Sequence, residues 1–182
     1  MTCPCQTNWR TGEYHISECP EAKKLRDSWC TPESLTKLLP RVDLDPASNH
    51  RSTVRAQAHC VLEDGQDGLA VDWNGSIFLN GPYSDMLPWA EKANKEWGAR
   101  RLHGAIFLVK LDPTTKWWAE LVRDRGDKRL QLWLPKKRLQ HIPPPRIKAS
   151  TNNFASAIIQ WRRPMQCGFW DLPLEGIATR WT

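Results

Sequence analysis

The feature that most constrains the fold is a short apolar run, Ile77-Phe78-Leu79, that stops at an Asn-Gly-Pro-Tyr turn. Such a run predicts a buried strand, and Gly-Pro ends a strand and begins a turn. Leu87 to Trp97 follows with apolar or small residues at helical spacing, and Ala105 to Val109 is a second continuous apolar run. Strand, helix and strand in succession predict an α/β domain. In an open sheet of this class, ligands bind at the edge where the strands end.

The turn carries groups that could activate an amine on a nucleobase. The lone pair of that amine is delocalised into the ring, so two acceptors must bind its hydrogens to make the nitrogen tetrahedral and nucleophilic. The side-chain oxygen of Asn80 and the carbonyl of Gly81 are two such acceptors. Pro82 would stiffen the turn, and Tyr83 could stack on a flipped base. Taken alone, the four residues are explained as well by an ordinary end of a strand.

Length and charge narrow the class of protein. A chain of 182 residues is most simply one domain, and a net charge of +6 favours a polyanionic partner, with an unspecific basic surface as the alternative. Several of the eleven tryptophans stand beside lysine or arginine, which suits stacking on bases. No apolar run is long enough to cross a membrane, and no apolar signal region begins the chain. We therefore expect a soluble, cytoplasmic protein.

The first 28 residues hold four possible ligands for one structural zinc ion, namely Cys3, Cys5, His15 and Cys19. Thiolate and imidazole are usual zinc ligands, and cysteines of an intracellular protein are seldom in disulfides. The spacing matches no standard zinc finger, and Cys30 could replace one of the four. Free thiols on a loose arm are the alternative.

Local patterns predict further elements. Thr31 can cap, and Pro32 can begin, a helix through Leu39. Val42 to Leu44 predicts a strand that Asp45-Pro46 ends, and Ser52 to Ala58 predicts a helix. Arg129 to Leu134 alternates as a half-buried strand does. In the helix from Leu87, the charged residues Glu91, Lys92, Lys95 and Glu96 are expected to face outward.

Residues 29–164 resemble the phage-type DNA adenine methyltransferases, an amino-group methyltransferase family. Asn80-Gly81-Pro82-Tyr83 is similar to the family's Asn-Pro-Pro-Tyr, with glycine in place of the first proline. Asp45-Pro46-Ala47-Ser48 and Asp67-Gly68-Leu69 resemble two earlier segments of the family, and Trp29-Cys30-Thr31-Pro32 is similar to the Trp-x-Thr-Pro that opens its domain. Several weak motifs in the family's order are far more specific than any one of them.

The resemblance implies a binding site for S-adenosylmethionine and a catalytic turn. Asp45 would face the methionine ammonium of the cofactor, and Asp67 would accept from its adenine amine, with an Asp-Gly turn as the alternative role of Asp67. The implied cofactor-binding residues are Thr31, Pro32, Asp45, Pro46, Ala47, Ser48 and Asp67, and the implied catalytic residues are Asn80, Gly81, Pro82 and Tyr83.

Candidate contacts to DNA fall in three segments. Lys116 and Trp117 belong to a stretch similar to the family's Thr-Asp-Thr-Lys/Arg-Trp-Trp, at a loop that flanks the pocket, with Thr114 where the family has Asp. Lys136, Lys137 and Arg138 form a cationic cluster that could follow phosphates, with a solvated hairpin tip as the alternative. Before the apolar run that resembles the family's final strand stand the candidates for touching the base, Asn152, Asn153 and Phe154.

The resemblance implies a Rossmann-like methyltransferase sheet, mostly parallel with an antiparallel C-terminal pair and with helices on both faces. We expect a leader over residues 1–28, a methyltransferase domain over 29–164, and a tail over 165–182 that either packs back or serves self-association.

The implied function is S-adenosylmethionine-dependent methylation of the exocyclic amine of adenine in DNA. Little room is left for a separate recognition domain, so we expect short or lax sequence recognition. A protein impaired at Gly81 that only binds nucleic acid or a partner is one alternative, and methylation of the cytosine amine is another. A phage-like modification or anti-restriction role is what the resemblance suggests.

Overall fold

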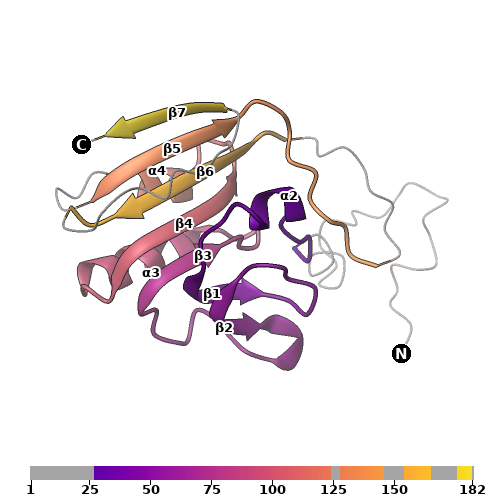
Figure 1. Cartoon of the computed structure of the whole chain (residues 1–182). Coiled ribbons are helices and arrows are strands. Elements are labelled where there is room, and N and C mark those ends of the chain that lie inside the picture. Colours follow the sequence, from indigo (N-terminus) through magenta and orange to yellow (C-terminus); the bar gives the residue numbers. More distant parts are fainter. Residues whose placement is uncertain (1–26, 124–127, 146–153, 165–175, 182) are drawn as a thin grey trace, which may run out of the picture.

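The structure is a computed structural model that describes residues 27–123, 128–145, 154–164 and 176–181, with only the backbone of 177–181. Seven strands form one mixed sheet in the order β2-β1-β3-β4-β6-β5-β7, with helices packed against it (Figure 1). The α/β class predicted from the sequence is confirmed. The strands are β1 Val42–Ser48, β2 Ala56–Val61, β3 Gly75–Leu79, β4 Leu102–Lys110, β5 Arg129–Pro135, β6 Ser156–Arg162 and β7 Gly176–Trp181. The helices are α2 Glu33–Thr36, the 3-10 turn η3 Leu62–Asp64, α3 Leu87–Gly98 and α4 Lys116–Val122.

The first four strands are parallel. β1 pairs with β2 on one side and with β3 on the other, and β3 pairs with β4. The chain therefore leaves β1 in one direction to form β2 and continues on the opposite side to form β3 and β4. Such a reversal of strand order opens a crevice at the carboxyl ends of the two strands, and ligands of open α/β sheets bind there.

The other three strands are paired antiparallel. β6 pairs with β4 and β5, and β5 pairs with β7. The predicted antiparallel C-terminal pair is present, and β7 adds a third antiparallel pairing from the segment that the sequence left as a tail. Of the two alternatives for that segment, residues 176–181 pack back and form the edge of the sheet (Figure 1).

Alternate side chains of the central strands form two separate apolar groups, one on each face of the sheet. On one face Phe107 of β4 packs with Trp97 of α3 and Trp161 of β6. On the other face Phe78 and Ile106 pack with Leu35 of α2. A single turn such as α2 is less than a layer of helices, so helices on both faces stay a prediction.

Two predictions around β1 are wrong. Asp45-Pro46 does not end the strand, because β1 continues to Ser48. The missing N–H of Pro46 is accommodated where the pairing of β1 with β2 shifts register, between Asp45 and Ser48. Ser52 to Ala58 is not helical, because residues 56–61 form the edge strand β2. Pairing with β1 overrides the weak helical spacing of that stretch.

Two predictions about the helices also need correction. The helix after Pro32 is only one turn, and Thr31 does not cap it, because no side chain bonds its first N–H groups. In α3, which matches its predicted span, Glu96 faces inward and is fully buried. Its carboxylate binds Lys92 Nζ at 2.7 Å and the guanidinium of Arg101. Burial alone would raise the pKa of Glu96, but these two cations lower it overall and keep the side chain charged.

Candidate active site

The carboxyl ends of β1 and β3 bring together the two strongest sequence motifs. Leu44 of β1 pairs with Ile77 of β3, so the Asp-Pro-Ala-Ser segment runs beside the strand that leads to Asn80. A narrow crevice lies between them. It is lined by Asp27, Trp29, Cys30, Thr31, Asp45, Ala47, Ser48, Asn49, Ser52, Val54, Phe78 and Asn80.

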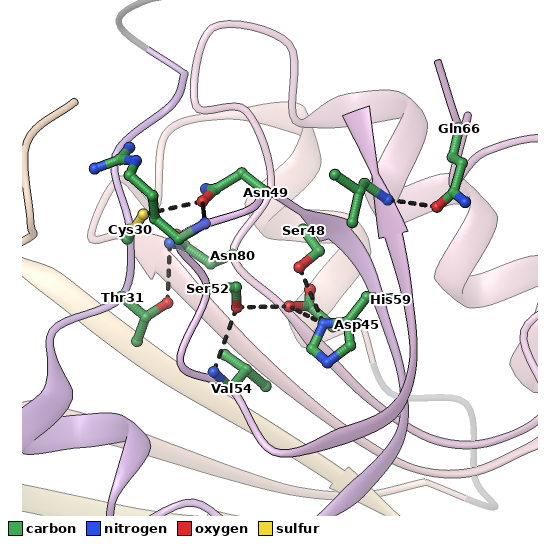
Figure 2. A network of polar contacts seen from close by, with 12 residues as sticks. Cys30, Thr31, Asp45, Ser48, Asn49, Ser52, Val54, His59, Gln66 and Asn80 are labelled. Atoms are coloured by element: carbon green, nitrogen blue, oxygen red, sulfur yellow. Dashed lines mark hydrogen bonds and ion pairs between the residues drawn. The ribbon is translucent and has the colours of Figure 1, made fainter. Parts of the chain in front are cut away.

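The amide of Asn80 has one orientation that its partners determine. Its Nδ2 donates to Thr31 Oγ1 at 3.1 Å and lies 3.5 Å from the carbonyl of Trp29 (Figure 2). The carbonyl of Trp29 can only accept and the hydroxyl of Thr31 accepts here, so the nitrogen faces them and Oδ1 faces the other way. Thr31, expected beside the methyl donor, is therefore the residue that orients the amide, and it also lines the crevice.

Tyr83 lies on the other side of the same amide. Its hydroxyl donates to Asn80 Oδ1 at 3.1 Å. The ring packs edge-on against Phe154 at 5.3 Å and against His141 at 6.0 Å between ring centroids. Burial raises the pKa of Tyr83, so the phenol stays a neutral donor. One carbonyl oxygen has two lone pairs, so Oδ1 can accept from Tyr83 and from a second donor.

Asp45 lies at the centre of a polar network on β1, which Figure 2 shows between Ser52 and His59. Its buried carboxylate accepts from Ser52 Oγ at 3.1 Å, and His59 Nδ1 lies 3.5 Å from the same carboxylate oxygen. Ser48 Oγ is 3.0 Å from that nitrogen. The bond to Asp45 raises the pKa of His59 despite partial burial. The network fixes the position of the Asp45 carboxylate at the crevice.

A larger cavity of about 330 Å³ continues from the crevice towards the Asn-Gly-Pro-Tyr turn. Ala47 and Ser48 of β1 line one side, and Pro82 and Ser84 line another. Asp27 closes the cavity from the N-terminal segment, because its carboxylate accepts from Ser84 Oγ at 2.6 Å. Three carboxylates, those of Asp27, Glu63 and Asp85, are among the lining groups, so the cavity suits a ligand with positive charge.

The Asp-Gly-Leu segment packs directly on the Asp-Pro-Ala-Ser segment. A Cβ placed on Gly68 would lie 1.8 Å from the carbonyl oxygen of Pro46, so only glycine fits there. The indole Nε1 of the buried Trp73 donates to the carbonyl of Gly68 at 2.7 Å. Close packing therefore explains why residue 68 is glycine, and a buried hydrogen bond links it to Trp73.

Two predicted cofactor contacts are placed differently from the rest. Asp67 is exposed and lines neither cavity, and its carboxylate accepts from the N–H of Leu69 at 2.9 Å. That is the Asp-Gly turn given as its alternative role. Pro32 is buried beside Thr31 as the residue before α2. Contacts of either residue with a cofactor stay predictions.

Gly81 is buried and does not require a glycine conformation. Gly65 and Gly75 are the glycines with positive φ in the described chain, and Gly81 is not among them. A Cβ on Gly81 would lie 3.1 Å from the thioether of Met86, a flexible group that can shift. An ordinary side chain could therefore replace the glycine that departs from the family's turn.

Most candidate DNA contacts lie along the same edge of the sheet. Lys116 is exposed at the start of α4, after the carboxyl end of β4. Lys136, Lys137 and Arg138 are exposed just after the carboxyl end of β5, in the orange segment that descends past α2 (Figure 1). Trp117 is half-buried against Trp118, and Phe154 contacts Tyr83. Asn152 and Asn153 lie outside the described residues.

The predicted zinc ligands Cys3, Cys5, His15 and Cys19 also lie outside the described residues. Cys30, offered as a replacement, is buried, and its thiol donates to Asn49 Oδ1 at 3.2 Å. Within the described chain, no group of three or more His, Cys, Asp or Glu side chains could hold a metal ion. No helix of the described part is long and apolar enough to span a membrane.

A family model described as DNA N-6-adenine-methyltransferase (Dam) matches residues 18–175. The chain belongs to this family. The match covers every segment that carried the resemblance in the sequence. Comparison with curated proteins and with solved structures gives no match. As a member of the Dam family, the chain belongs with methyltransferases whose substrate is DNA.

Three residues near the site of this Dam family member were not found from the sequence. Asp27 binds Ser84 just after the Asn-Gly-Pro-Tyr turn, His59 binds Asp45, and His141 packs against Tyr83. None belongs to a recognisable motif, and each reaches the site from a segment distant in the chain. His59 stands on β2, a strand that the sequence did not predict.

Proposed function

We propose that this protein transfers the methyl group of S-adenosylmethionine to the exocyclic amine of adenine in DNA. Membership of the Dam family supports the reaction class. The observation that carries the proposal is the fixed amide of Asn80 at the end of β3, beside the cavity lined by β1. It puts an oriented acceptor next to a space of the size that small ligands occupy.

The cavity fits the charge of the proposed cofactor, which carries an ammonium and a sulfonium. The carboxylate of Asp45 lines the crevice, and Asp27, Glu63 and Asp85 line the larger space. Ala47 and Ser48 leave room for a ligand to approach the backbone of β1. When bound, S-adenosylmethionine supplies an electrophilic methyl group on sulfur.

The chain's own groups prepare the attacking nitrogen. Asn80 Oδ1 accepts one hydrogen of the adenine amine, and the carbonyl of Gly81 accepts the other, so the nitrogen lone pair leaves conjugation with the ring. Tyr83 stacks on the flipped base. Because Oδ1 is oriented before the base arrives, no reorganisation of the amide is needed during the reaction.

The nucleic-acid contacts follow from the shared edge. Lys116, Lys137 and their neighbours would bind phosphates flanking the flipped nucleotide, and Trp117 and Phe154 would contact bases. With little room for a separate recognition domain, we expect a short or lax recognition sequence. An intracellular site of action, in a bacterium or a phage-infected bacterium, belongs to the same proposal.

Labelled-methyl transfer to unmethylated DNA tests the proposal. Wild type should produce N6-methyladenine, and Asn80→Ala should lower the rate at least about 100-fold, since removing one oriented stabilising group has that effect in other enzymes. Asn74→Ala, which changes an exposed asparagine of the loop before β3, is the matched control and should leave the rate unchanged. Undiminished transfer by Asn80→Ala would exclude the proposed role of the amide.

Two observations favour a second candidate, a protein that binds DNA without methylating it. Gly81 replaces the family's proline, and Tyr83 is packed against two other rings in this structure. Gly81→Pro separates the candidates: an inert wild type together with an active proline variant would assign the binding role. Recovery of N4-methylcytosine as the product would instead assign the cytosine amine as the target.

A further inference from the structure

His141 is a buried side chain whose polar atoms form no hydrogen bond within the described chain. It is 5% exposed, and neither ring nitrogen has a hydrogen-bond partner among the described residues. Burying a polar group without a partner is unfavourable, so native proteins rarely keep such a group unless it has a role. The two ring nitrogens therefore offer a donor and an acceptor for which the described residues hold no partner.

His141 lies against the group proposed to receive the base. Its ring is edge-on to Tyr83 at 6.0 Å and tilted by 52° to Phe154 at 6.0 Å. Tyr83 is in turn bonded to Asn80. A base that lies on Tyr83 with its amine at Asn80 therefore comes within reach of the imidazole.

The backbone that carries His141 is held in place. The neighbouring Ile142 pairs with Cys30 through two backbone hydrogen bonds of 2.9 and 3.0 Å. The guanidinium of Arg51 donates to the carbonyl of Pro143 at 2.7 Å and to that of Ser28 at 2.6 Å. The imidazole therefore projects from a segment of fixed backbone. A side chain that discriminates between ligands needs such a rigid support.

The imidazole is uncharged near neutral pH, because burial lowers its pKa to about 4. A neutral imidazole has one N–H donor and one acceptor nitrogen. Adenine has a ring nitrogen acceptor on each side of its amine, N1 on one side and N7 on the other. The donor of the imidazole matches either of them.

We propose that His141 is a specificity-determining residue that donates a hydrogen bond to a ring nitrogen of the flipped adenine, beside the amine held by Asn80. The inference rests on the proposed methyl transfer to adenine and deepens it. According to this proposal, the segment after β5 forms the wall of the base pocket that faces Tyr83. Without that bond, the enzyme should methylate adenine and an analogue that lacks the bonded ring nitrogen at the same rate.

The test compares wild type with His141→Phe, which keeps an aromatic ring and removes both nitrogens. Single-turnover transfer is measured on random-sequence duplexes that contain adenine, 7-deazaadenine or 1-deazaadenine. Wild type should lose about tenfold on one analogue, the effect of one lost hydrogen bond. His141→Phe should be about tenfold slower on adenine and show no further loss on that analogue. Cofactor binding should stay unchanged in the variant.

A second variant guards against misfolding of His141→Phe. His141→Gln keeps a donor and an acceptor and should retain part of the analogue penalty. An equal penalty in wild type and both variants, or none in wild type, would overturn the inference while leaving the proposed function intact. Failure of wild type to methylate ordinary adenine would overturn the proposed function and this inference together.

Discussion

Asn80 shows how a single residue's role depends on groups distant in the sequence. The sequence predicts its oxygen as an acceptor, because the Asn-Gly-Pro-Tyr turn resembles a known catalytic turn. It does not predict that Thr31, 49 residues earlier, accepts from the amide nitrogen and orients it. A hydrogen bond between distant segments leaves no local pattern in a sequence, so only the structure could reveal it.

His141 gives a residue-scale prediction about stability and pH. Unfolded histidine binds a proton below its ordinary pKa of 6.5, whereas folded His141 does so only below about 4. Acid therefore favours the unfolded chain between these values, and stability rises with pH across that window. The two rings that pack against His141 carry no charge, because Phe154 is uncharged and Tyr83 stays neutral.

Urea unfolding from pH 7 to pH 4 measures the effect. The two pKa values of His141, 6.5 when unfolded and about 4 when folded, correspond to at most roughly 3 kcal/mol of unfolding free energy lost by wild type over this range. His141→Phe should lack that part of the loss. Identical acid dependence in the two proteins would show that His141 titrates normally when folded.

The elements around the proposed cofactor cavity are joined by one close approach. Gly68, in the loop before β3, touches the carbonyl of Pro46 in β1, and Trp73 holds that loop from the core. The sequence predicts the two segments and their order, but it assigns Ser52 to Ala58 to a helix and ends β1 too early. Both errors arise because strand pairing, which is not local, overrides spacing and the usual effect of proline.

Gly68→Ala tests this contact at the element scale. The added Cβ would force β1 and the loop apart, so we expect a loss of about 1–3 kcal/mol in unfolding free energy and weaker binding of S-adenosylmethionine. Gly98→Ala is the matched control, because a Cβ there meets nothing within 4 Å and lies at the end of α3. It should be neutral or stabilising by up to about 1 kcal/mol. Chemical denaturation and titration calorimetry measure both quantities, and equal behaviour of the two variants would contradict the close packing.

At the scale of the whole molecule, the candidate catalytic and DNA-binding residues gather at one edge of a seven-stranded sheet. The sequence predicts that edge, because polar segments follow the apolar runs. It does not predict β7 or its pairing with β5, since that pairing joins segments more than 40 residues apart and the tail has no strong pattern. The positions of Asn153 and the zinc candidates stay predictions.

Salt dependence of DNA binding tests the edge as an electrostatic surface. Lys137→Ala removes an exposed cation after β5, and the slope of log K against log salt for duplex DNA should fall by about 0.9 for one lost phosphate contact. Lys95→Ala is the control, because this exposed lysine stands on α3 near the turn that leads into the start of β4, at the opposite edge. Fluorescence anisotropy at several salt concentrations gives both slopes. Equal reductions would mean that binding is spread over the whole surface.

The direction of β7 has a practical consequence for studying this enzyme. Its first residue, Gly176, pairs with Pro135 near the catalytic edge, and Trp181 pairs with Leu130 at the far edge. An affinity tag or a biosensor linkage attached beyond Trp181 would therefore tether the molecule at the edge of the sheet opposite the proposed active site. The face proposed to bind DNA would remain turned towards the solution, accessible for measurements on an immobilised sample.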